Sequence, residues 1–468
     1  MSTVTSSLLR PGAGEACRIE SVDLDGQGIA HRAGKVVFVQ GGLPGETIVT
    51  RPVRSKARFD VAEIQYILHA SPDRVQPRCR HYGICGGCNL QHADVRAQLA
   101  FKQRVLEDTL WHLGRVRPAQ MLPPIEGRAW GYRFRARLAV RDVPSRGGVL
   151  IGFHEKKSSY VADLQGCEIL PVRISGMLPA LKALVESLSI RHRIPQIEVA
   201  VGDCQHPPHH PTALVFRTLL PLSPRDHALL LAFGRQHSLE IWQQPAGPDS
   251  VRLLCDGLGR VDGSSALAYD LPEFGIRLPF GPTDFTQVNA GVNRQLLGRA
   301  IRMLALEPDH RVVDLFCGLG NFTLPLATRA RRVTGVEGLS SLVEQGRRNA
   351  RANRQALLAP PGKEGVQFRV ANLFHFDQDA WQALGRVDRL LIDPPRDGAL
   401  AVARVLAALA PARRPARMVY VSCNPATLAR DLGLMVHEGG WRVSQAGVAN
   451  MFPHTAHVES IVLLEPQG

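Results

Sequence analysis

The stretch Asp314-Leu-Phe-Cys-Gly-Leu-Gly-Asn321 joins a short apolar run to a segment with helical spacing. Gly318 and Gly320 allow the backbone to approach a ligand closely, and the helix that follows offers free N–H groups at its N-terminus. Similar apolar runs, separated by helical segments, recur at 311–316, 332–337, 366–370, 387–392 and 417–422. This alternation predicts a parallel sheet with crossover helices, which is an α/β fold.

Two acceptors suit a nucleoside ligand beside this loop. Glu337 ends the second apolar run, 17 residues beyond Gly320, where a carboxylate can accept hydrogen bonds from both ribose hydroxyls. Asn372 follows the third run, where an adenine edge would lie. The third glycine of the dinucleotide-binding spacing is missing, so S-adenosylmethionine is favoured over NAD.

The end of the chain supports this interpretation. Two strands, 441–448 and 458–464, are expected on either side of a Met-Phe-Pro turn. A final hairpin on a doubly wound sheet is typical of adenosylmethionine-dependent methyltransferases. We therefore expect a Rossmann-like class I methyltransferase domain with a terminal antiparallel hairpin.

Reactive side chains follow the later strands. Asp393 and Cys423 follow the fourth and fifth runs, and Glu459 opens the last strand. Ligands of an open parallel sheet bind beyond the carboxyl ends of its strands, and an antiparallel last strand starts at that same edge. A thiol and carboxylates are thus expected to converge on the methyl donor.

This pairing suits methylation of carbon 5 of uracil, which is a poor nucleophile. A thiolate that adds to carbon 6 creates an enolate, carbon 5 attacks the sulfonium methyl, and a base then removes the carbon 5 proton. Cys423 fits the nucleophile and Glu459 the base. Taken alone, Cys423 would be interpreted as a buried strand-end cysteine. Cys317 has no such company and is expected to be structural.

The length and composition limit the number of domains and the kinds of binding partner that are expected. The 468 residues suggest two to four domains, and the net charge of +14 favours a polyanionic partner. Only 7 of the 56 basic residues are lysine, so a compositional bias is the alternative explanation of that charge. Neither a long apolar run nor an apolar N-terminal segment is present, which predicts a cytoplasmic protein without membrane contact. Nothing in the sequence demands more than a monomer.

The first part of the chain has a different pattern. Short runs at 16–22, 35–39, 46–53 and 59–67 alternate with glycines and predict a small β-barrel, a fold that often binds oligonucleotides. Cationic residues at 51, 54, 56 and 58 lie on its later strands, although a basic strand face is often only solvated. Residues 93–113 have helical spacing.

Three of the nine cysteines are clustered: Cys79, Cys85 and Cys88. Disulfides are not expected in a cytosolic chain. Together with the distant Cys167, the cluster indicates a tetrahedral thiolate site and leaves zinc or iron–sulfur open.

Three motifs carry a family resemblance: Asp393-Pro-Pro-Arg-Asp-Gly398, Met418-Val-Tyr-Val-Ser-Cys-Asn-Pro-Ala-Thr427 and Met451-Phe-Pro-His-Thr-Ala-His-Val-Glu459. They resemble the motifs of the RNA uracil-5-methyltransferases. The resemblance implies Cys423 as nucleophile, Glu459 as base and S-adenosylmethionine as methyl donor. It implies donor contacts at Gln287, Phe316, Asn321, Glu337, Asn372 and Asp393. Asn450 departs from the pattern, because the family usually has an aspartate there.

The front of the chain resembles the members of this family that methylate 23S ribosomal RNA. In those enzymes, four cysteines spaced like Cys79, Cys85, Cys88 and Cys167 bind a [4Fe–4S] cluster, here expected to be structural or to help hold RNA. The turn Leu43-Pro-Gly-Glu46 resembles the hallmark of the TRAM domain. The implied organisation is a TRAM-like RNA-binding barrel (8–70), a central α+β iron–sulfur domain (71–268) and the catalytic domain (269–468). Helix 93–113 is free to pack on the last of these.

A uridine in folded RNA must be flipped out of its stack to reach a thiol. In the segment 132–138, Arg133, Arg135 and Arg137 alternate, which would place them on one face of a strand. With Lys156 and Lys157 they are our candidates for holding the displaced RNA backbone. Phe285 is expected to border the target base.

Three other functions compete. The first is uracil methylation at a different 23S uridine or in transfer RNA. The second, cytosine-5 methylation, is disfavoured because 393–396 lacks the cysteine that such RNA enzymes carry beside the proline. The third, a non-catalytic RNA-binding iron–sulfur protein, is disfavoured by the intact Cys423 and Glu459.

Overall fold

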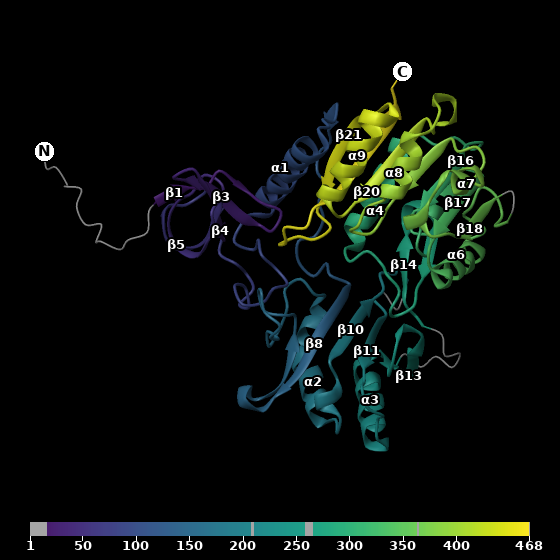
Figure 1. The fold of residues 1–468 in the computed structure, drawn as a ribbon. Coiled ribbons are helices and arrows are strands. Elements are labelled where there is room, and N and C mark those ends of the chain that lie inside the picture. The colour runs from purple at the N-terminus through teal and green to yellow at the C-terminus, as the bar shows by residue number, and fades with distance from the viewer. Residues whose placement is uncertain (1–15, 207–209, 258–264, 363–364, 468) are drawn as a thin grey trace, which may run out of the picture. The chain divides into compact units, whose positions relative to one another are not determined.

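The computed structural model describes residues 16–206, 210–257, 265–362 and 365–467, shown in Figure 1. Residues 8–15 of the expected barrel lie outside the described residues. The chain divides into two compact units. The small unit holds the residues up to Tyr82 with 88–105 and 454–457, and the large unit holds 83–87, 106–453 and the residues from Val458 on. No helix in the described ranges is long and apolar enough to cross a membrane.

The small unit contains a six-stranded sheet. In spatial order its strands are β1 (Ala16–Arg18), β5 (Thr47–Ser55), β6 (Phe59–His69), β4 (Lys35–Gln40), β3 (Gln27–Arg32) and β2 (Ser21–Val22). Alternate apolar residues such as Val37 and Ile48 form its core. The pattern does not predict β3, because Gly28 interrupts it. A side chain at Gly28 would come within 2.8 Å of the Gly42 carbonyl oxygen, so the fold requires glycine there.

Helix α1 (Val95–Gly114) matches the expected helix to within two residues. Its first half belongs to the small unit and its second half to the large unit.

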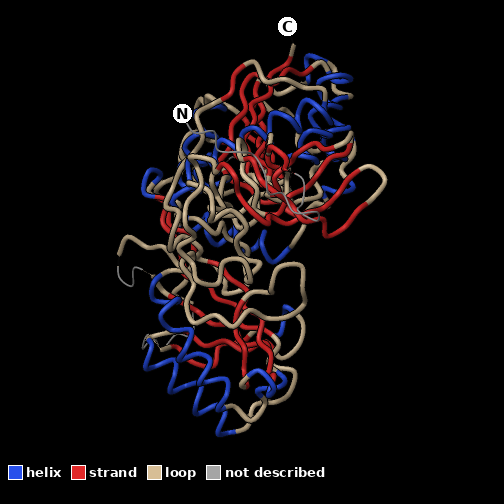
Figure 2. Tube along the Cα trace, turned by 90° about the vertical axis from the view of Figure 1, so that its left-hand side faces the viewer, coloured by secondary structure: helices blue, strands red, loops and turns tan. Residues whose placement is uncertain are grey.

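The large unit begins with a second six-stranded sheet. In spatial order its strands are β13 (Arg252–Asp256), β12 (Glu240–Gln244), β11 (Thr212–Arg217), β10 (Gln196–Val201), β8 (Arg135–Val143) and β9 (Gly148–Gly152). Helices α2 (Val172–Ser187) and α3 (Pro224–His237) pack on this sheet, and Figures 1 and 2 show them on the same side. Leu138 and Ile197 are buried, whereas Arg137 is exposed, as period-two alternation requires.

An eight-stranded sheet carries the predicted methyltransferase topology. In spatial order its strands are β18 (Val366–Val370), β17 (Arg332–Glu337), β16 (Arg311–Leu315), β19 (Arg389–Ile392), β20 (Arg417–Ser422), β22 (Glu459–Pro466), β21 (Trp441–Ala449) and β7 (Gln120–Met121). The first five are mutually parallel, and β22 is antiparallel to both β20 and β21. The predicted runs and the final hairpin are thus confirmed, while the two-residue strand β7 is too short for any pattern to reveal.

Helices accompany this sheet along the chain. They are α4 (Ala290–Leu304), α5 (Thr323–Ala327), α6 (Ser340–Ala352), α7 (Gln378–Gln382), α8 (Leu400–Ala407) and α9 (Pro425–Gly439), and a hairpin of β14 (Ala268–Leu271) and β15 (Ile276–Pro279) precedes them. The central strands β19 and β20 are apolar and buried at 390–392 and 418–421, as expected for a sheet covered on both faces.

Candidate active site

Strands β20 and β22 bring the predicted thiol and carboxylate together. Ser422 pairs with Ser460 in the antiparallel register, and the Ser460 hydroxyl donates to the Ser422 carbonyl at 3.0 Å. Cys423 and Glu459 are the next residues outward on these two strands, so they lie at the same edge. Glu459 is 3% exposed and Cys423 is half-buried.

The charges around the thiol oppose its ionisation. Burial, and then the negative charges of Glu459 and Asp393, raise the pKa of the Cys423 thiol to about 11, while Arg396 acts in the opposite direction. In the free protein the thiol is therefore protonated at neutral pH. A cationic ligand placed beside these carboxylates would favour the thiolate.

The loop after β16 has a ligand-binding backbone. Phe316, Gly318 and Gly320 all have left-handed conformations, with φ of 64°, 55° and 102°. Such a conformation costs a non-glycine residue roughly 1 kcal/mol or more and is typical of functional loops. Cys317, within the loop, is 5% exposed, and its buried sulfur lies where a side chain at Gly335 would touch it.

Glu337 and Asn372 lie around the same loop. Glu337 accepts from the Gly318 N–H through one oxygen and from the Leu339 N–H through the other, both at 3.1 Å. The Asn372 side chain accepts from the Phe374 N–H at 3.0 Å, and the Phe374 ring lies 5.9 Å from that of Phe316. Each carboxylate oxygen of Glu337 keeps a further lone pair that can accept a hydrogen bond from a ribose hydroxyl.

An amide network links Asn321 to residues that the sequence does not single out. Its side-chain oxygen accepts from the Tyr269 hydroxyl at 2.9 Å and from the Asn293 amide at 3.0 Å. Tyr269 and Asn293 also line a small cavity with Gln287. Phe285, two residues before Gln287, is 72% exposed. Only the position of Asn293, near the start of α4 and six residues after Gln287, could have pointed to this role.

Asp314 adds a third carboxyl group to those of Glu337 and Asp393. Asp314 is fully buried, and its Oδ2 accepts from the Thr323 hydroxyl at 2.6 Å. Its Oδ1 has no hydrogen-bond partner among the described residues. Burial, and then the charges of Asp393 and Glu337, raise the pKa of Asp314 to about 8. Burial raises the pKa of Asp393 to about 7. Asp314, Asp393 and Glu337 lie close enough to affect one another, and a cluster of carboxyls of this kind suits a cationic ligand.

The cationic residues predicted to hold RNA do not form one row. The predicted placement of Arg133 on the strand face is wrong, because β8 begins at Arg135. The Arg133 guanidinium instead lies 5.2 Å from the Phe153 ring centre. Arg135 is turned inward and donates to the Pro282 carbonyl at 2.7 Å. Arg137 is exposed and pairs with Glu198 at 3.1 Å. Only Arg137 of these three is placed on an open strand face.

The four candidate cluster ligands are divided between the units. Cys79 and Cys88 belong to the small unit, and Cys85 and Cys167 to the large unit. None of the four is in a disulfide. Across the described ranges, no group of three or more histidine, cysteine, aspartate or glutamate side chains is arranged to hold a metal ion.

Comparison with known proteins agrees with this fold and edge. Residues 279–467 match the family model described as tRNA (Uracil-5-)-methyltransferase. The tRNA (uracil-54, C5)-methyltransferase of Pyrococcus abyssi, solved with S-adenosyl-L-homocysteine, has a TM-score of 0.70 at 23% identity and covers 97% of this chain and 99% of its own. That likeness concerns the fold alone.

Sequence relatives are much closer. The 23S rRNA (uracil(1939)-C(5))-methyltransferase RlmD of Bordetella bronchiseptica is 52% identical over 451 residues, which is 96% of this chain and 93% of that protein. The protein of the same name from Cupriavidus pinatubonensis is 52% identical over 99% of this chain and 98% of its own.

The fold and its edge define an S-adenosylmethionine-dependent RNA (uracil-5-)-methyltransferase. Within that class, the chain belongs to the RlmD family of 23S rRNA uracil-C5-methyltransferases.

Proposed function

We propose that this enzyme methylates carbon 5 of the uridine of 23S ribosomal RNA that corresponds to position 1939, the target named for its relatives. The observation that carries the proposal is the pairing of β20 with β22, which sets Cys423 beside Glu459 at the carboxyl edge. Methyl transfer to transfer RNA or to another 23S uridine is the alternative.

Cys423 acts first on the flipped uridine. Its thiolate adds to carbon 6, and the electron pair of the 5,6 double bond moves toward the carbonyl oxygen at carbon 4. The resulting enolate makes carbon 5 nucleophilic. S-adenosylmethionine supplies the methyl group from its sulfonium centre.

Glu459 completes the reaction. Its carboxylate removes the proton from carbon 5, the double bond re-forms, and the Cys423 sulfur leaves carbon 6 as a thiolate. Burial of Glu459 shields this proton transfer from bulk water. Release of S-adenosyl-L-homocysteine and loss of the Glu459 proton to solvent then regenerate the enzyme, with 5-methyluridine in the RNA.

Six residues hold the methyl donor in this proposal: Gln287, Phe316, Asn321, Glu337, Asn372 and Asp393. Glu337 binds the ribose hydroxyls, and Asn372 lies at the adenine edge. Asp393, with the neighbouring Asp314, favours the cationic end of the donor. That positive charge offsets the carboxylates around Cys423 and so lowers the pKa of the thiol when the site is loaded.

The cysteines Cys79, Cys85, Cys88 and Cys167 bind a structural [4Fe–4S] cluster in our proposal. Four cysteines outside any disulfide are a donor set that suits iron–sulfur as well as zinc. The Gly87 N–H lies 3.4 Å from the Cys85 sulfur, the kind of donor that stabilises a ligating thiolate. The cluster takes no part in methyl transfer.

We further propose that residues 8–70 act as a TRAM-like RNA-binding barrel, that 71–268 form the central domain, and that 269–468 form the catalytic domain. We also propose that the enzyme works as a monomer in the cytoplasm, where its RNA substrate is available.

Nucleoside analysis tests the main proposal. The protein is incubated with S-adenosylmethionine and 23S RNA from cells that lack it, and the RNA is digested and examined by mass spectrometry. We expect 5-methyluridine, mapped to the position equivalent to 1939 in the relatives. A 5-methylcytidine product, or methylation only of transfer RNA, would contradict the proposal.

Metal analysis tests the cluster separately. Anaerobically purified protein is expected to be brown and to contain iron and sulfide, and Cys85→Ser is expected to lose both. Cys17→Ser, a buried thiol outside the proposed set, is the control. A colourless protein that contains zinc would refute the iron–sulfur assignment.

A further inference from the structure

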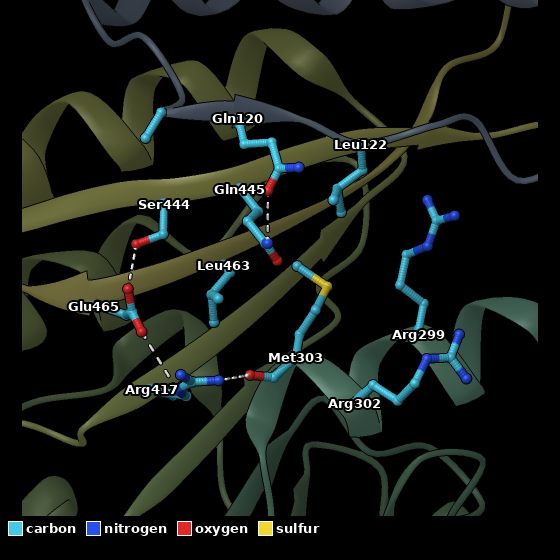
Figure 3. Close-up of a pocket in the computed structure, with 11 residues that line it drawn as sticks. Gln120, Leu122, Arg299, Arg302, Met303, Arg417, Ser444, Gln445, Leu463 and Glu465 are labelled. Carbon is cyan, nitrogen blue, oxygen red and sulfur yellow. Dashed lines mark hydrogen bonds and ion pairs between the residues drawn. The ribbon is translucent and has the colours of Figure 1, made fainter.

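A hollow of about 570 Å³ lies at the edge of the eight-stranded sheet opposite the active site. Figure 3 shows ten of its residues by name: Gln120, Leu122, Arg299, Arg302, Met303, Arg417, Ser444, Gln445, Leu463 and Glu465. Arg417 begins β20, whereas Cys423 follows its last residue. At about 3.3 Å per residue, the two edges are roughly 20 Å apart along this strand, so the hollow is separate from the methylation site.

Two guanidinium groups on one wall of the hollow form no ion pair with a described residue. Arg299 and Arg302 are three residues apart on α4 and extend from the same side of the helix in Figure 3. Arg299 donates to the Pro123 carbonyl at 2.7 Å. The Arg302 side chain is exposed, and its guanidinium makes no hydrogen bond or ion pair with a described residue. Burial, and then the charge of Arg302, lower the pKa of Arg299.

The acidic side chains described nearby form no ion pair with Arg299 or Arg302. Glu465 lies across the hollow, where it binds Arg417 at 3.3 Å and Arg442 at 3.2 Å. Glu273 approaches α4 beside Gly298, but no ion pair joins it to Arg302 within the described ranges. Two adjacent guanidinium groups that form no ion pair with a described acid favour an anionic ligand such as phosphate.

The rest of the hollow suits a planar ring. Leu122, Met303 and Leu463 give it an apolar surface. On the adjoining wall the Gln445 amide donates to the Gln120 side-chain oxygen at 3.0 Å. This bond leaves an N–H donor on Gln120 and an oxygen acceptor on Gln445 side by side. Every nucleobase has an edge with an adjacent acceptor and donor that would complement this pair.

We propose that this hollow binds one nucleotide of a single-stranded RNA segment, with its phosphate on Arg299 and Arg302 and its base against Met303. Its volume falls within the range of about 300–1,000 Å³ that is usual for ligand pockets. RNA is favoured over a free nucleotide because Arg302 and Gln120 are both exposed, so that a chain can enter and leave the hollow. The inference needs RNA as partner but not the identity of the methylated uridine.

Binding by the full chain tests the proposal. The affinity for a fluorescent single-stranded oligoadenylate is measured by anisotropy over a range of salt concentrations. The double variant Arg299→Glu with Arg302→Glu should weaken binding by about ten-fold or more and reduce the salt slope by roughly one or more. The control, Arg225→Glu with Arg235→Glu on α3, changes two exposed arginines and the net charge equally and should behave like the unaltered protein apart from a small general loss of attraction.

Two further measurements keep the test decisive. Arg302→Glu alone, which removes no described contact, should show part of the loss with an unchanged melting temperature. Competition with adenosine monophosphate should be weak, and adenosine weaker still, because the phosphate is the anchor. Equal RNA affinity in the hollow and control variants would overturn the proposal. Adenosine monophosphate binding more tightly than the oligonucleotide would overturn it in favour of a free-nucleotide site.

Discussion

The two edges of the eight-stranded sheet carry side chains of opposite charge. The two edges also differ in how far those charged groups are matched by hydrogen-bond partners. At the carboxyl edge, Glu337, Asp393 and Glu459 lie at strand ends on the same edge as Cys423. At the other edge, strands β16, β17, β19 and β20 all begin with an arginine: Arg311, Arg332, Arg389 and Arg417.

Two of these arginines bind backbone carbonyls of the fold, whereas two acids near the carboxyl edge are held where their charge is disfavoured. Arg389 donates to the Leu304 carbonyl at 2.7 Å, and Arg417 to the Met303 carbonyl at 3.0 Å, so both satisfy carbonyls at the C-terminus of α4. The acids at the carboxyl edge include desolvated groups with raised pKa values. Ionisable groups whose surroundings disfavour their charged form are typical of sites where a bound ligand supplies the missing counter-charge.

The largest expected effect is at the carboxyl edge. Cys423→Ala should reduce methyl transfer by at least about 10,000-fold, because no other group can activate carbon 5. Donor binding should persist. Transfer of labelled methyl groups measures the first quantity and equilibrium dialysis the second. Cys204→Ala, which removes a buried thiol elsewhere in the large unit, is the control and should retain turnover.

The neighbouring carboxylate should show a different defect. Glu459→Gln should still allow addition and methylation but slow proton removal by about 100- to 10,000-fold. A methylated protein–RNA adduct should therefore accumulate and migrate slowly on a denaturing gel. Combining Glu459→Gln with Cys423→Ala should eliminate the adduct; an adduct that persists in the double variant would exclude Cys423 as its attachment point.

The acidic edge should also respond to pH in two opposite ways. The pKa of Asp393 is raised to about 7 and that of Asp314 to about 8, so the folded free protein binds more protons than the unfolded chain over this range. These groups therefore make the free protein less stable as pH rises from about 5 to 8. The cationic donor should bind more tightly over the same range, because the carboxylates become charged.

Thermal unfolding with and without donor measures both trends. The stabilisation by donor should increase with pH while the melting temperature of the free protein decreases. Asp393→Asn should flatten part of both trends, whereas Asp256→Asn, outside this site, should leave them unchanged. Donor affinity that is independent of pH would mean that these carboxyls do not face the cation.

The smallest expected effect is at the arginine edge. Arg389→Met should lower the free energy of unfolding by about 1 kcal/mol, because its hydrogen bonds to the end of α4 are lost. Methylation by the folded protein should be unchanged. Urea denaturation measures the stability. Arg311→Met, whose side chain makes no bond to a described residue, should change it by less than about 0.5 kcal/mol.

The sequence predicts the carboxyl edge better than the rest of the site. Apolar runs place Cys423 and Glu459 at strand ends, and the antiparallel last strand then makes them neighbours. Tyr269 and Asn293 escape prediction, because their contact with Asn321 depends on how the 268–279 hairpin and α4 pack, not on any local pattern. Asp314 opens the quoted stretch at the end of β16, yet only its burial in the folded chain distinguishes it from an ordinary polar strand end.

Local signals also fail where an element is short or its pattern is interrupted. The alternation at 133–137 continues beyond the strand, so it cannot show that β8 begins at Arg135. Strand β7 has two residues and exists only because it pairs with β21.

The insertion of β22 between β20 and β21 has a consequence for synthesis of the protein. Both neighbours of β22 precede it in the chain, so during translation they emerge before the strand that joins them. Until residues 459–466 leave the ribosome, β20 and β21 each retain an unpaired edge that can pair wrongly or recruit chaperones. The same delay keeps Cys423 and Glu459 apart, so under the proposed mechanism a nascent chain cannot modify the RNA around it before its sheet is closed.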